Sequence, residues 1–442
     1  MKNRISNWVG QKIDRYKENL LFKRLLSVLG IDILVKLSGI ILLPIYLRLM
    51  TQHDYGLYGY LLSIIMTFSL VLNFGLYIPV AKFYHDFEKQ AEKGSLLFTI
   101  FSLLLAILVV GIVPIYMFKW DYIIIRILFN NPINYEIYRI PILLSIVASI
   151  FNFMLTNFFF TSEKIRALKN YNIFRIIFIN AISLLFLLVL KGSDTVRVRL
   201  LSTYSVELTL FFVFAYFPAR ELEARFSRSI ARSGLKLALP VMISAIFGII
   251  INFSDKFFLE KYGSFKDMSY YYLAVSCASI IPMIFASFQN AWLPLFLKEK
   301  DLKRNIEKTN KLLFRIFIIF LLLSIFILVF VKLILEFGII QSKYQETIYI
   351  LPILLVSQII SALVPLYSNY LVYFEKTHIA SIAGFVVSGV SLGLSLLLIP
   401  KWGVYGAATV SCISNACYFT IYFLLIRSYT KKRLDRPYLV AE

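Results

Sequence analysis

Long apolar runs separated by short polar segments make up most of this sequence. Each run has about twenty residues, which is the length that a helix needs to cross a hydrocarbon core of about 30 Å. The runs lie at residues 26–47, 56–81, 95–117, 138–160, 173–190, 199–219, 237–258, 269–296, 312–336, 347–373, 379–399 and 403–426. The polar segments between them are too short to fold as separate domains. The pattern therefore predicts an all-α, polytopic membrane protein of about twelve transmembrane helices.

The second half of the chain repeats features of the first half at an offset of about 212 residues. The string YRIPILL at 138–144 matches YILPILL at 349–355, the pair Glu163-Lys164 matches Glu375-Lys376, and Asp54, Tyr58 and Ser63 match Asp267, Tyr271 and Ser276. An even number of spans in each half gives both halves the same direction through the membrane. Parallel repeats of this kind are related by an axis along the membrane normal and surround a central cavity, so the repeat points to transport by alternating access.

These observations predict two six-helix bundles with short flanking segments. The boundaries are a cytoplasmic interfacial segment at 1–25, a first bundle at 26–219, a cytoplasmic linker at 220–236, a second bundle at 237–427 and a cytoplasmic tail at 428–442. Apolar residues at helical spacing among basic ones suggest that the first segment lies on the membrane surface; a frayed tail is the alternative.

The charge distribution predicts the orientation of the chain. Only 16% of the residues are charged and 59% are apolar, yet the net charge is +21. With the N-terminus inside, the inner segments hold about 30 of the 46 Lys and Arg, roughly three times as many as the outer segments. This bias predicts a multi-pass protein of the cytoplasmic (inner) membrane with both termini in the cytoplasm. It also accounts for the basic excess without nucleic-acid binding.

Residues that could support catalysis or bind a cofactor form no recognisable pattern in the sequence. The three cysteines fall within predicted spans and the three histidines in three separate loops, so neither a disulfide framework nor a metal site is indicated. The chain lacks a Walker A motif, paired acidic residues and a large outer domain. We therefore expect no enzymatic activity and no cofactor.

Ionisable residues deep within a span are costly and are candidates for function. Asp32 and Lys36 lie four residues apart on one face of the first span, with Lys36 near the membrane midplane. Lys36 could attract an anion in a cavity, tuned by Asp32, or the two could form a structural ion pair. Glu207 lies similarly deep in the sixth span, as a coupling-ion or charge-pair candidate.

Further candidates lie near the ends of spans. Arg48, Lys82 and Lys256 belong to spans that the repeat brings together, and Asp255 precedes Lys256. Snorkelling to the lipid headgroups is the alternative for each cation, with Arg139 and Arg175 given less weight. Amides occupy comparable places in the two halves at Asn73, Gln289 and Asn290, close to Gly75 and Pro79 in one half and to Trp292 and Pro294 in the other. These amides could contact a sugar or join helices, and the glycine and prolines should bend both spans.

Several strings resemble a known family. They are LLPIYLRLM at 42–50, DYGLY at 54–58, FGL at 74–76, KFY at 82–84, DKFFL at 255–259, FQNAWLP at 288–294 and LIPKWGVYGAA at 398–408. Together they resemble the polysaccharide biosynthesis proteins, the Wzx-type O-antigen flippases of the multidrug/oligosaccharidyl-lipid/polysaccharide exporter (MOP) superfamily. The resemblance covers about residues 25–427. It implies the MATE-like fold of twelve helices in two bundles around a V-shaped cavity.

The resemblance also implies a function. Such a flippase moves a polyprenyl-pyrophosphate-linked oligosaccharide from the inner to the outer leaflet, with cavity cations that here would be Lys36, Arg48, Lys82 and Lys256. Coupling to an H⁺ or Na⁺ gradient or to the membrane potential is expected, with Asp32 or Asp255 as ion sites. The expected partners are the substrate, membrane lipids and a glycan polymerase or ligase, and the expected state is a monomer.

Two alternatives to this function differ in class. An ion-coupled multidrug or small-molecule antiporter shares the fold but would favour a predominantly acidic cavity. A membrane polymerase or ligase would need catalytic outer loops. The related lipid II flippases commonly have two further helices, so the end of this chain after the twelfth span favours the oligosaccharide flippases.

Overall fold

The computed structural model describes residues 39, 41–190, 192–374, 376 and 378–435. The regular structure of these residues is helical throughout. The helices are α2 (Leu43–Leu49), α3 (Gln52–Leu72), α4 (Tyr77–Phe83), α5 (Gln90–Met117), α6 (Trp120–Leu128), α7 (Tyr135–Thr161), α8 (Ile165–Val189), α9 (Thr195–Phe214), α10 (Tyr216–Ala219), α11 (Arg228–Tyr262), α12 (Phe265–Ala278), α13 (Ile280–Lys298), α14 (Leu302–Glu336), α15 (Thr347–Tyr373) and α16 (His378–Asp435), with a short 3₁₀ turn η1 (Ser342–Tyr344).

The predicted fold class is confirmed. The described residues contain 10 helical segments that are long and apolar enough to cross a membrane. The last of them joins two predicted spans, which meet at a kink where Gly403 has a φ of 52° close after Pro400. The first predicted span, 26–47, lies largely outside the described residues, and α2 is its visible end. The interfacial segment predicted at 1–25 lies outside them entirely.

Some element boundaries differ from those that apolar runs alone predict. The helix α6 lies within 118–137, a stretch that the apolar pattern treats as an outer loop. The predicted linker, 220–236, contains an irregular turn and then the first residues of α11, which begins at Arg228. Apolar runs mark the part of a helix that is in hydrocarbon, whereas the helical hydrogen bonding continues beyond it into the headgroup region.

The second predicted span is interrupted, as its glycine and proline suggested. The helix α3 ends at Leu72 and α4 begins at Tyr77, with Phe74 and Gly75 at φ values of 57° and 69°. A Cβ atom on Gly75 would lie 2.9 Å from the carbonyl oxygen of Ala238, so the break brings this backbone against α11. In the other half the break separates α12 from α13 at Ser279, three residues before Pro282, and α13 runs on past Pro294.

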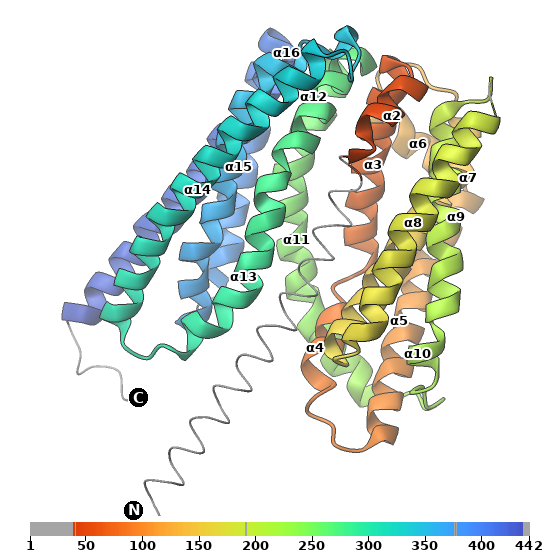
Figure 1. The fold of residues 1–442 in the computed structure, drawn as a ribbon. Coiled ribbons are helices and arrows are strands. Elements are labelled where there is room, and N and C mark those ends of the chain that lie inside the picture. The colour runs from red at the N-terminus through yellow and green to blue at the C-terminus, as the bar shows by residue number, and fades with distance from the viewer. Residues whose placement is uncertain (1–38, 40, 191, 375, 377, 436–442) are drawn as a thin grey trace, which may run out of the picture.

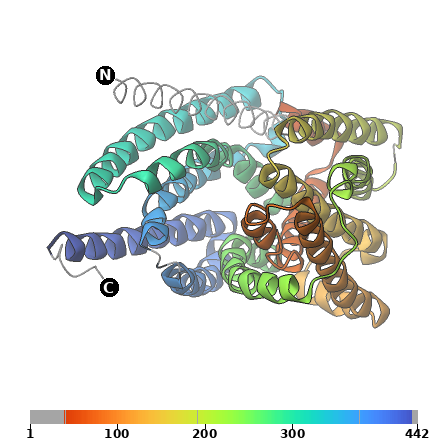
Figure 2. The same ribbon diagram turned by 90° about the horizontal axis from the view of Figure 1, so that it is seen from below.

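The helices form two groups joined by α11 (Figures 1 and 2). We call α2–α10 the N half and α12–α16 the C half. The two halves meet at the end that carries the loops 129–134, 263–264 and 337–346, which we call the outer end after the predicted topology. They diverge toward the opposite, inner end, which carries α4, α10 and the turn between α13 and α14 (Figure 1). The arrangement is closed at the outer end.

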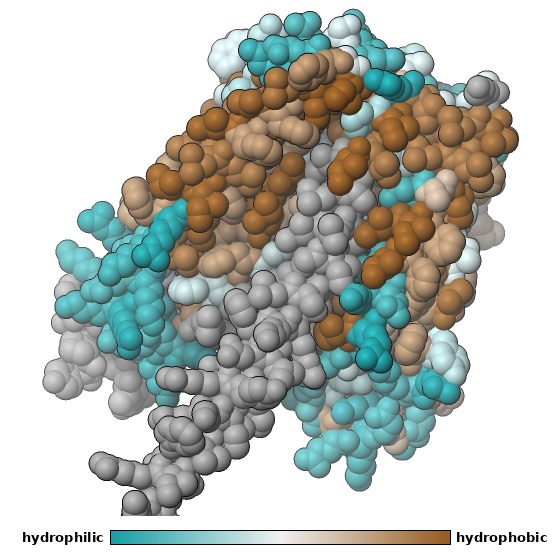
Figure 3. All heavy atoms as spheres, in the orientation of Figure 1, coloured by the Kyte–Doolittle hydropathy of each residue, from teal (hydrophilic) through white to brown (hydrophobic). Residues whose placement is uncertain are grey.

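Apolar side chains cover the helical surfaces between the two ends. Figure 3 shows hydrophobic residues over most of this surface and hydrophilic ones gathered at the ends. Val110 of α5 and Phe314 and Leu322 of α14 are among the exposed apolar residues. In water such a surface would drive aggregation, whereas in a bilayer it contacts the acyl chains.

The outer closure depends on close contact between α3 and α12. A Cβ atom on Gly56 would lie 1.8 Å from the carbonyl oxygen of Phe265, and one on Gly59 would lie 2.4 Å from the Tyr272 ring. Small residues allow two helix backbones to approach closely inside a membrane. Further contacts across the same closure are bonds from Arg48 to the carbonyls of Gly338 and Ile339, and a T-shaped ring contact between Tyr55 and Tyr344.

The substitution Gly56→Ala should weaken this closure. The added methyl group meets backbone that cannot move aside, and overpacking of this kind costs about 1–3 kcal/mol. We expect a lower unfolding temperature in detergent, measured by tryptophan fluorescence. Gly393→Ala in α16 is the matched control, because the new methyl group meets no atom of another helix within 4 Å. Equal unfolding temperatures for the two variants would contradict the close packing of α3 on α12.

Candidate functional site

A cavity of about 690 Å³, lined by both polar and apolar side chains, lies inside the closed outer end, between the two halves. The helix α3 contributes one wall, and α11, α12, α15 and α16 contribute the others. The polar side chains that line it are Ser63, Thr67, Asn252, Asp255, Lys256, Tyr271, Tyr272, Ser276, Ser279, Gln358, Ser361, Ser411, Ser414 and Asn415. Hydroxyl and amide groups dominate this list, and they can donate and accept hydrogen bonds without a net charge.

A lysine and a carboxylate meet in the wall of this cavity. The Nζ atom of Lys256 lies 3.1 and 3.2 Å from the two carboxylate oxygens of Asp255, and it donates to the carbonyl of Asn252 at 2.7 Å. The hydroxyl of Tyr271, from α12, donates to the Asp255 carboxylate. The side chains of Lys256 and Asp255 are only 14% and 6% exposed. The pair has no net charge, and Lys256 can bind an anion only in competition with Asp255.

Hydrogen-bonded hydroxyls support the wall behind this pair. Ser254 of α11 and Ser391 of α16 are joined at 3.0 Å, which links the two helices. Ser357 of α15 lies 2.9 Å from Ser411 and accepts from Asn415 at 2.9 Å. These bonds satisfy polar groups that would otherwise be costly to bury. They hold α11, α15 and α16 as one polar surface facing α3.

Of the predicted cavity cations in the described residues, only Lys256 lines the cavity. The guanidinium of Arg48 bonds two carbonyls just beyond the end of α14, where the helix dipole favours a cation. Lys82 is exposed in the last turn of α4, toward the inner end. Both are long cations at helix ends, and such side chains reach polar surroundings at the membrane boundary. Lys36 and Asp32 lie outside the described residues.

Glu207 occupies a buried ion pair within the N half and does not line the central cavity. Its carboxylate accepts from Nε of Arg175 at 2.8 Å, and its side chain is only 4% exposed. Arg175 therefore points into the bundle, whereas Arg139 pairs with Asp121 at 2.6 Å. Of the two roles considered for Glu207, coupling-ion site or charge pair, the geometry matches the charge pair. Removing one partner of such a pair leaves an uncompensated charge in the bundle.

The predicted amides have different surroundings. Asn73 lies at the break between α3 and α4, 3% exposed, and its side-chain atoms have no partner among the described residues. Gln289 of α13 donates to the side-chain oxygen of Asn369 in α15 at 2.8 Å, which is the helix-joining alternative. The side chain of Asn290 lies outside the described part of the structure.

Arg199 and Glu260, two charged residues that were not among the sequence candidates, lie in specific environments in the fold. The guanidinium of Arg199 lies between the rings of Tyr46 and Tyr58, at 3.8 and 4.1 Å. Glu260 is 1% exposed near the end of α11. Both lie near the ends of predicted spans, where charged residues are common, so their positions in the sequence do not mark them as functional candidates. Tyr271 belonged to the repeat pattern, but no sequence signal pairs it with Asp255.

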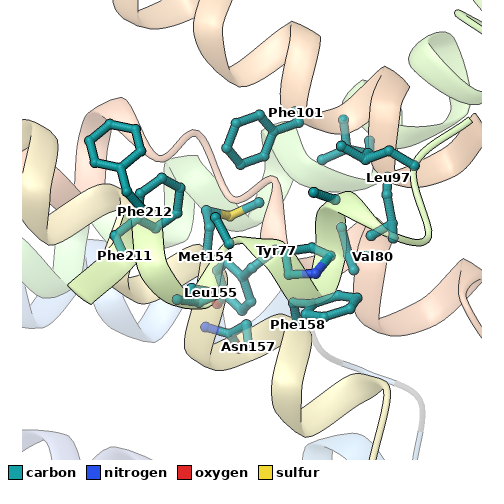
Figure 4. Close-up of a pocket in the computed structure, with 15 residues that line it drawn as sticks. Tyr77, Val80, Leu97, Phe101, Met154, Leu155, Asn157, Phe158, Phe211 and Phe212 are labelled. Atoms are coloured by element: carbon teal, nitrogen blue, oxygen red, sulfur yellow. The ribbon is translucent and has the colours of Figure 1, made fainter. Parts of the chain in front are cut away.

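A second cavity, of about 210 Å³, lies in the N half and is apolar (Figure 4). Its walls include the rings of Phe101, Phe158 and Phe211 with Met154, and its polar lining residues are Tyr77 and Asn157. These walls contain no Asp, Glu, Lys, Arg or His, so they offer no cation to compensate a buried anion. The candidate site for a polar ligand is therefore the central cavity.

Comparison with known proteins places the chain in a family. A family described as "Polysaccharide biosynthesis protein" matches residues 21–300. The chain belongs to this family. The predicted family membership is thereby confirmed. No individually curated protein sequence is significantly similar to it.

Solved structures resemble the fold over nearly the whole chain. The lipid II flippase MurJ in an inward closed conformation matches with a TM-score of 0.66 at 14% identity, over 96% of this chain and 93% of that one. An inward-facing multidrug resistance MATE family transporter of the MOP superfamily matches with a TM-score of 0.64 at 12% identity, over 92% and 94%. An outward-facing MATE transporter matches less well, with a TM-score of 0.58 at 13% identity over 92% and 96%. The chain thus has the fold of these flippases and transporters.

A double substitution tests whether Glu207 is structural. Glu207→Gln alone leaves Arg175 unpaired in the bundle, which costs about 3–5 kcal/mol, and should reduce the amount of folded protein. Arg175→Met with Glu207→Leu removes both charges and should restore it, as measured by size-exclusion chromatography of a fluorescent fusion. If the double variant folds and yet loses all activity in cells, the pair has a role beyond structure.

Proposed function

We propose that this protein is a flippase that moves a polyprenyl-pyrophosphate-linked oligosaccharide from the inner to the outer leaflet by alternating access. The observation that carries the proposal is the central cavity, where hydroxyls, amides and one lysine line the space between α3 and the helices α11, α12, α15 and α16. Family membership adds support, because polysaccharide synthesis at a membrane requires glycans to cross it.

The chemistry of the cavity suits such a headgroup. Sugar hydroxyls can exchange hydrogen bonds with Thr67, Ser276, Gln358 and Asn415, which line opposite walls. The pyrophosphate would approach Lys256, where a charge-assisted hydrogen bond compensates part of the buried negative charge. The polyprenyl chain is apolar and stays in lipid at the side of the cavity. The protein therefore needs to enclose only the polar part of the substrate.

Asp255 would couple substrate binding to an ion gradient. The anion competes with this carboxylate for Lys256, so binding requires Asp255 to turn toward Tyr271 alone or to accept a proton or a cation. A proton or Na⁺ gradient could act at this point. The membrane potential is a further source of drive, because moving one elementary charge across it is worth about 2.3 kcal/mol per 100 mV.

The cellular setting that we propose follows the charge distribution. The protein acts as a monomer in the cytoplasmic membrane, with both termini in the cytoplasm, and supplies the lipid-linked glycan to a polymerase or ligase on the outer face. Lys36 and Asp32, in the first span, remain proposed contributors to the cationic side of the cavity.

Deleting the gene tests the function directly. We expect sugar-loaded polyprenyl pyrophosphate to accumulate on the inner leaflet and a surface glycan to disappear, as measured by lipid extraction with mass spectrometry and by glycan staining. The buried carboxylate of Asp255 would also suit a cationic drug, which is the second candidate. An intact glycan combined with altered drug sensitivity would favour the antiporter and contradict the flippase.

Lys256 should be required for transport. Lys256→Ala removes one charge-assisted hydrogen bond to the anion, worth about 1.5–3 kcal/mol, so flipping should fall by about 10- to 100-fold. Because this variant leaves Asp255 unpaired, Asp255→Asn with Lys256→Gln is tested beside it and should also be impaired. Lys119→Ala, an exposed lysine at the outer end, is the control. Full complementation of the deletion strain by the double variant would remove the pair from the mechanism.

A further inference from the structure

Glu260 is a buried carboxylate that joins the two halves at the outer end. It lies near the end of α11 and is 1% exposed. Its oxygens accept from the backbone N–H of Asn130 at 2.9 Å and from that of Asn131 at 2.8 Å, and the side-chain amide of Asn131 lies 3.2 Å away. These donors belong to the loop between α6 and α7 of the N half.

Side-chain amides of the same loop also donate to backbone carbonyls at the end of α11. The Asn131 amide donates to the backbone oxygens of Glu260 and Gly263 at 2.9 and 3.2 Å, and the Asn130 amide donates to that of Lys261 at 3.2 Å. The last carbonyls of a helix have no partner within the helix, so a loop that supplies donors caps it. Asn130 and Asn131 therefore bind both the Glu260 side chain and the end of α11.

Aromatic contacts extend this junction into α3. The hydroxyl of Tyr60 donates to the carbonyl of Leu128 at 2.6 Å, and its ring stacks on Phe253 of α11 at 5.9 Å. Its ring also meets the edge of Phe129 at 5.0 Å. Tyr60 thus packs between the residues that precede the loop and α11, and it joins α3 to the junction.

The charge of Glu260 is compensated by amides alone. Among the described residues, no Lys, Arg or His lies within ion-pair distance of its carboxylate, so peptide and side-chain N–H groups carry the compensation. Such bonds to an ionised acceptor are about twice as strong as neutral ones. They require the loop and the helix end to stay in register, because a buried carboxylate that loses its donors must be hydrated instead.

The end of α11 is attached to the C half. Ser254 ties it to α16, and it leads through Gly263 directly into α12. The loop 129–131 belongs to the N half. We infer that Glu260 is the positioning residue that latches the outer end shut in the inward-open state. This inference rests on the proposed alternating access, and it assigns no contact between Glu260 and the substrate.

The test measures which side of the membrane can reach the cavity. Thr67 lines the cavity, so Thr67→Cys, in a background where Cys277, Cys412 and Cys417 are replaced by Ala, serves as the reporter. A membrane-impermeant maleimide is applied to right-side-out vesicles. We expect Glu260→Gln to raise the labelling rate by about tenfold or more, because the amide cannot replace the charge-assisted bonds. Labelling of inside-out vesicles should fall.

Asp267→Asn is the matched control at the same end. Its carboxylate bonds Ser264 within its own helix cap and makes no bond to the N half that the structure records. Its labelling should equal that of the parent. If Glu260→Gln leaves labelling unchanged in folded protein, or if Asp267→Asn raises it equally, the latch is wrong.

Asn131→Ala provides a second route if Glu260→Gln does not fold. It removes the side-chain donor but keeps the carboxylate and the backbone N–H groups. We expect a smaller rise in outer labelling, and no rise would contradict the latch. The assay needs no substrate, so it can fail while lipid extraction still supports the flippase, or succeed while lipid extraction contradicts it.

Discussion

The cost of placing charge in hydrocarbon organises this structure. An ionised side chain inside a bilayer needs an opposite charge, a set of N–H donors or water. The described residues show the first two solutions. Arg175 with Glu207 and Lys256 with Asp255 are ion pairs, and Glu260 is held by amides. The role that each of these charged groups can have depends on its position in the fold.

The two halves use the same repeated residues differently. Asp54 and Asp267 both lie in the first turn of a helix, where each backbone N–H bonds a hydroxyl of the capping residue. Four residues later, Tyr58 packs against Arg199 inside the N half, whereas Tyr271 donates to Asp255 at the cavity. The repeat therefore preserves the framework while the chemistry diverges. Among the described residues, the N half pairs its deep Glu207 within its own bundle, whereas α11, which leads into the C half, presents a lysine to the cavity.

The outer end and the cavity are linked through α11. This helix carries Asp255 and Lys256 in the cavity wall and Glu260 at the latch, only about one turn further along. Its Ala238 packs against Gly75 in the break between α3 and α4, and its last turn contacts the loop at Asn130 and Asn131. A change at the ion pair and a change at the latch therefore act on one rigid element. That geometry allows binding at the Asp255–Lys256 pair to influence the closure of the outer end directly through α11.

The sequence alone determined the fold class, the approximate spans and the existence of two halves, because the length of an apolar run must match the thickness of the membrane. It also indicated the break near Gly75, since glycine and proline disturb helices locally. At the kink near Pro400 it indicated only a boundary between two spans, 379–399 and 403–426. Lys256 was a candidate because it lies near the end of a span that the repeat brings together with others.

Tertiary structure decided what each charge contacts. Nothing local distinguishes Arg48, which bonds carbonyls at the outer end, from Lys256, which faces the cavity. The partner of Glu260 lies about 130 residues away along the chain, and its donors are backbone groups that every residue has. Such contacts depend on how two helical bundles meet, which hydropathy does not encode. The sequence identifies which residues need a partner in the membrane, and only packing chooses that partner.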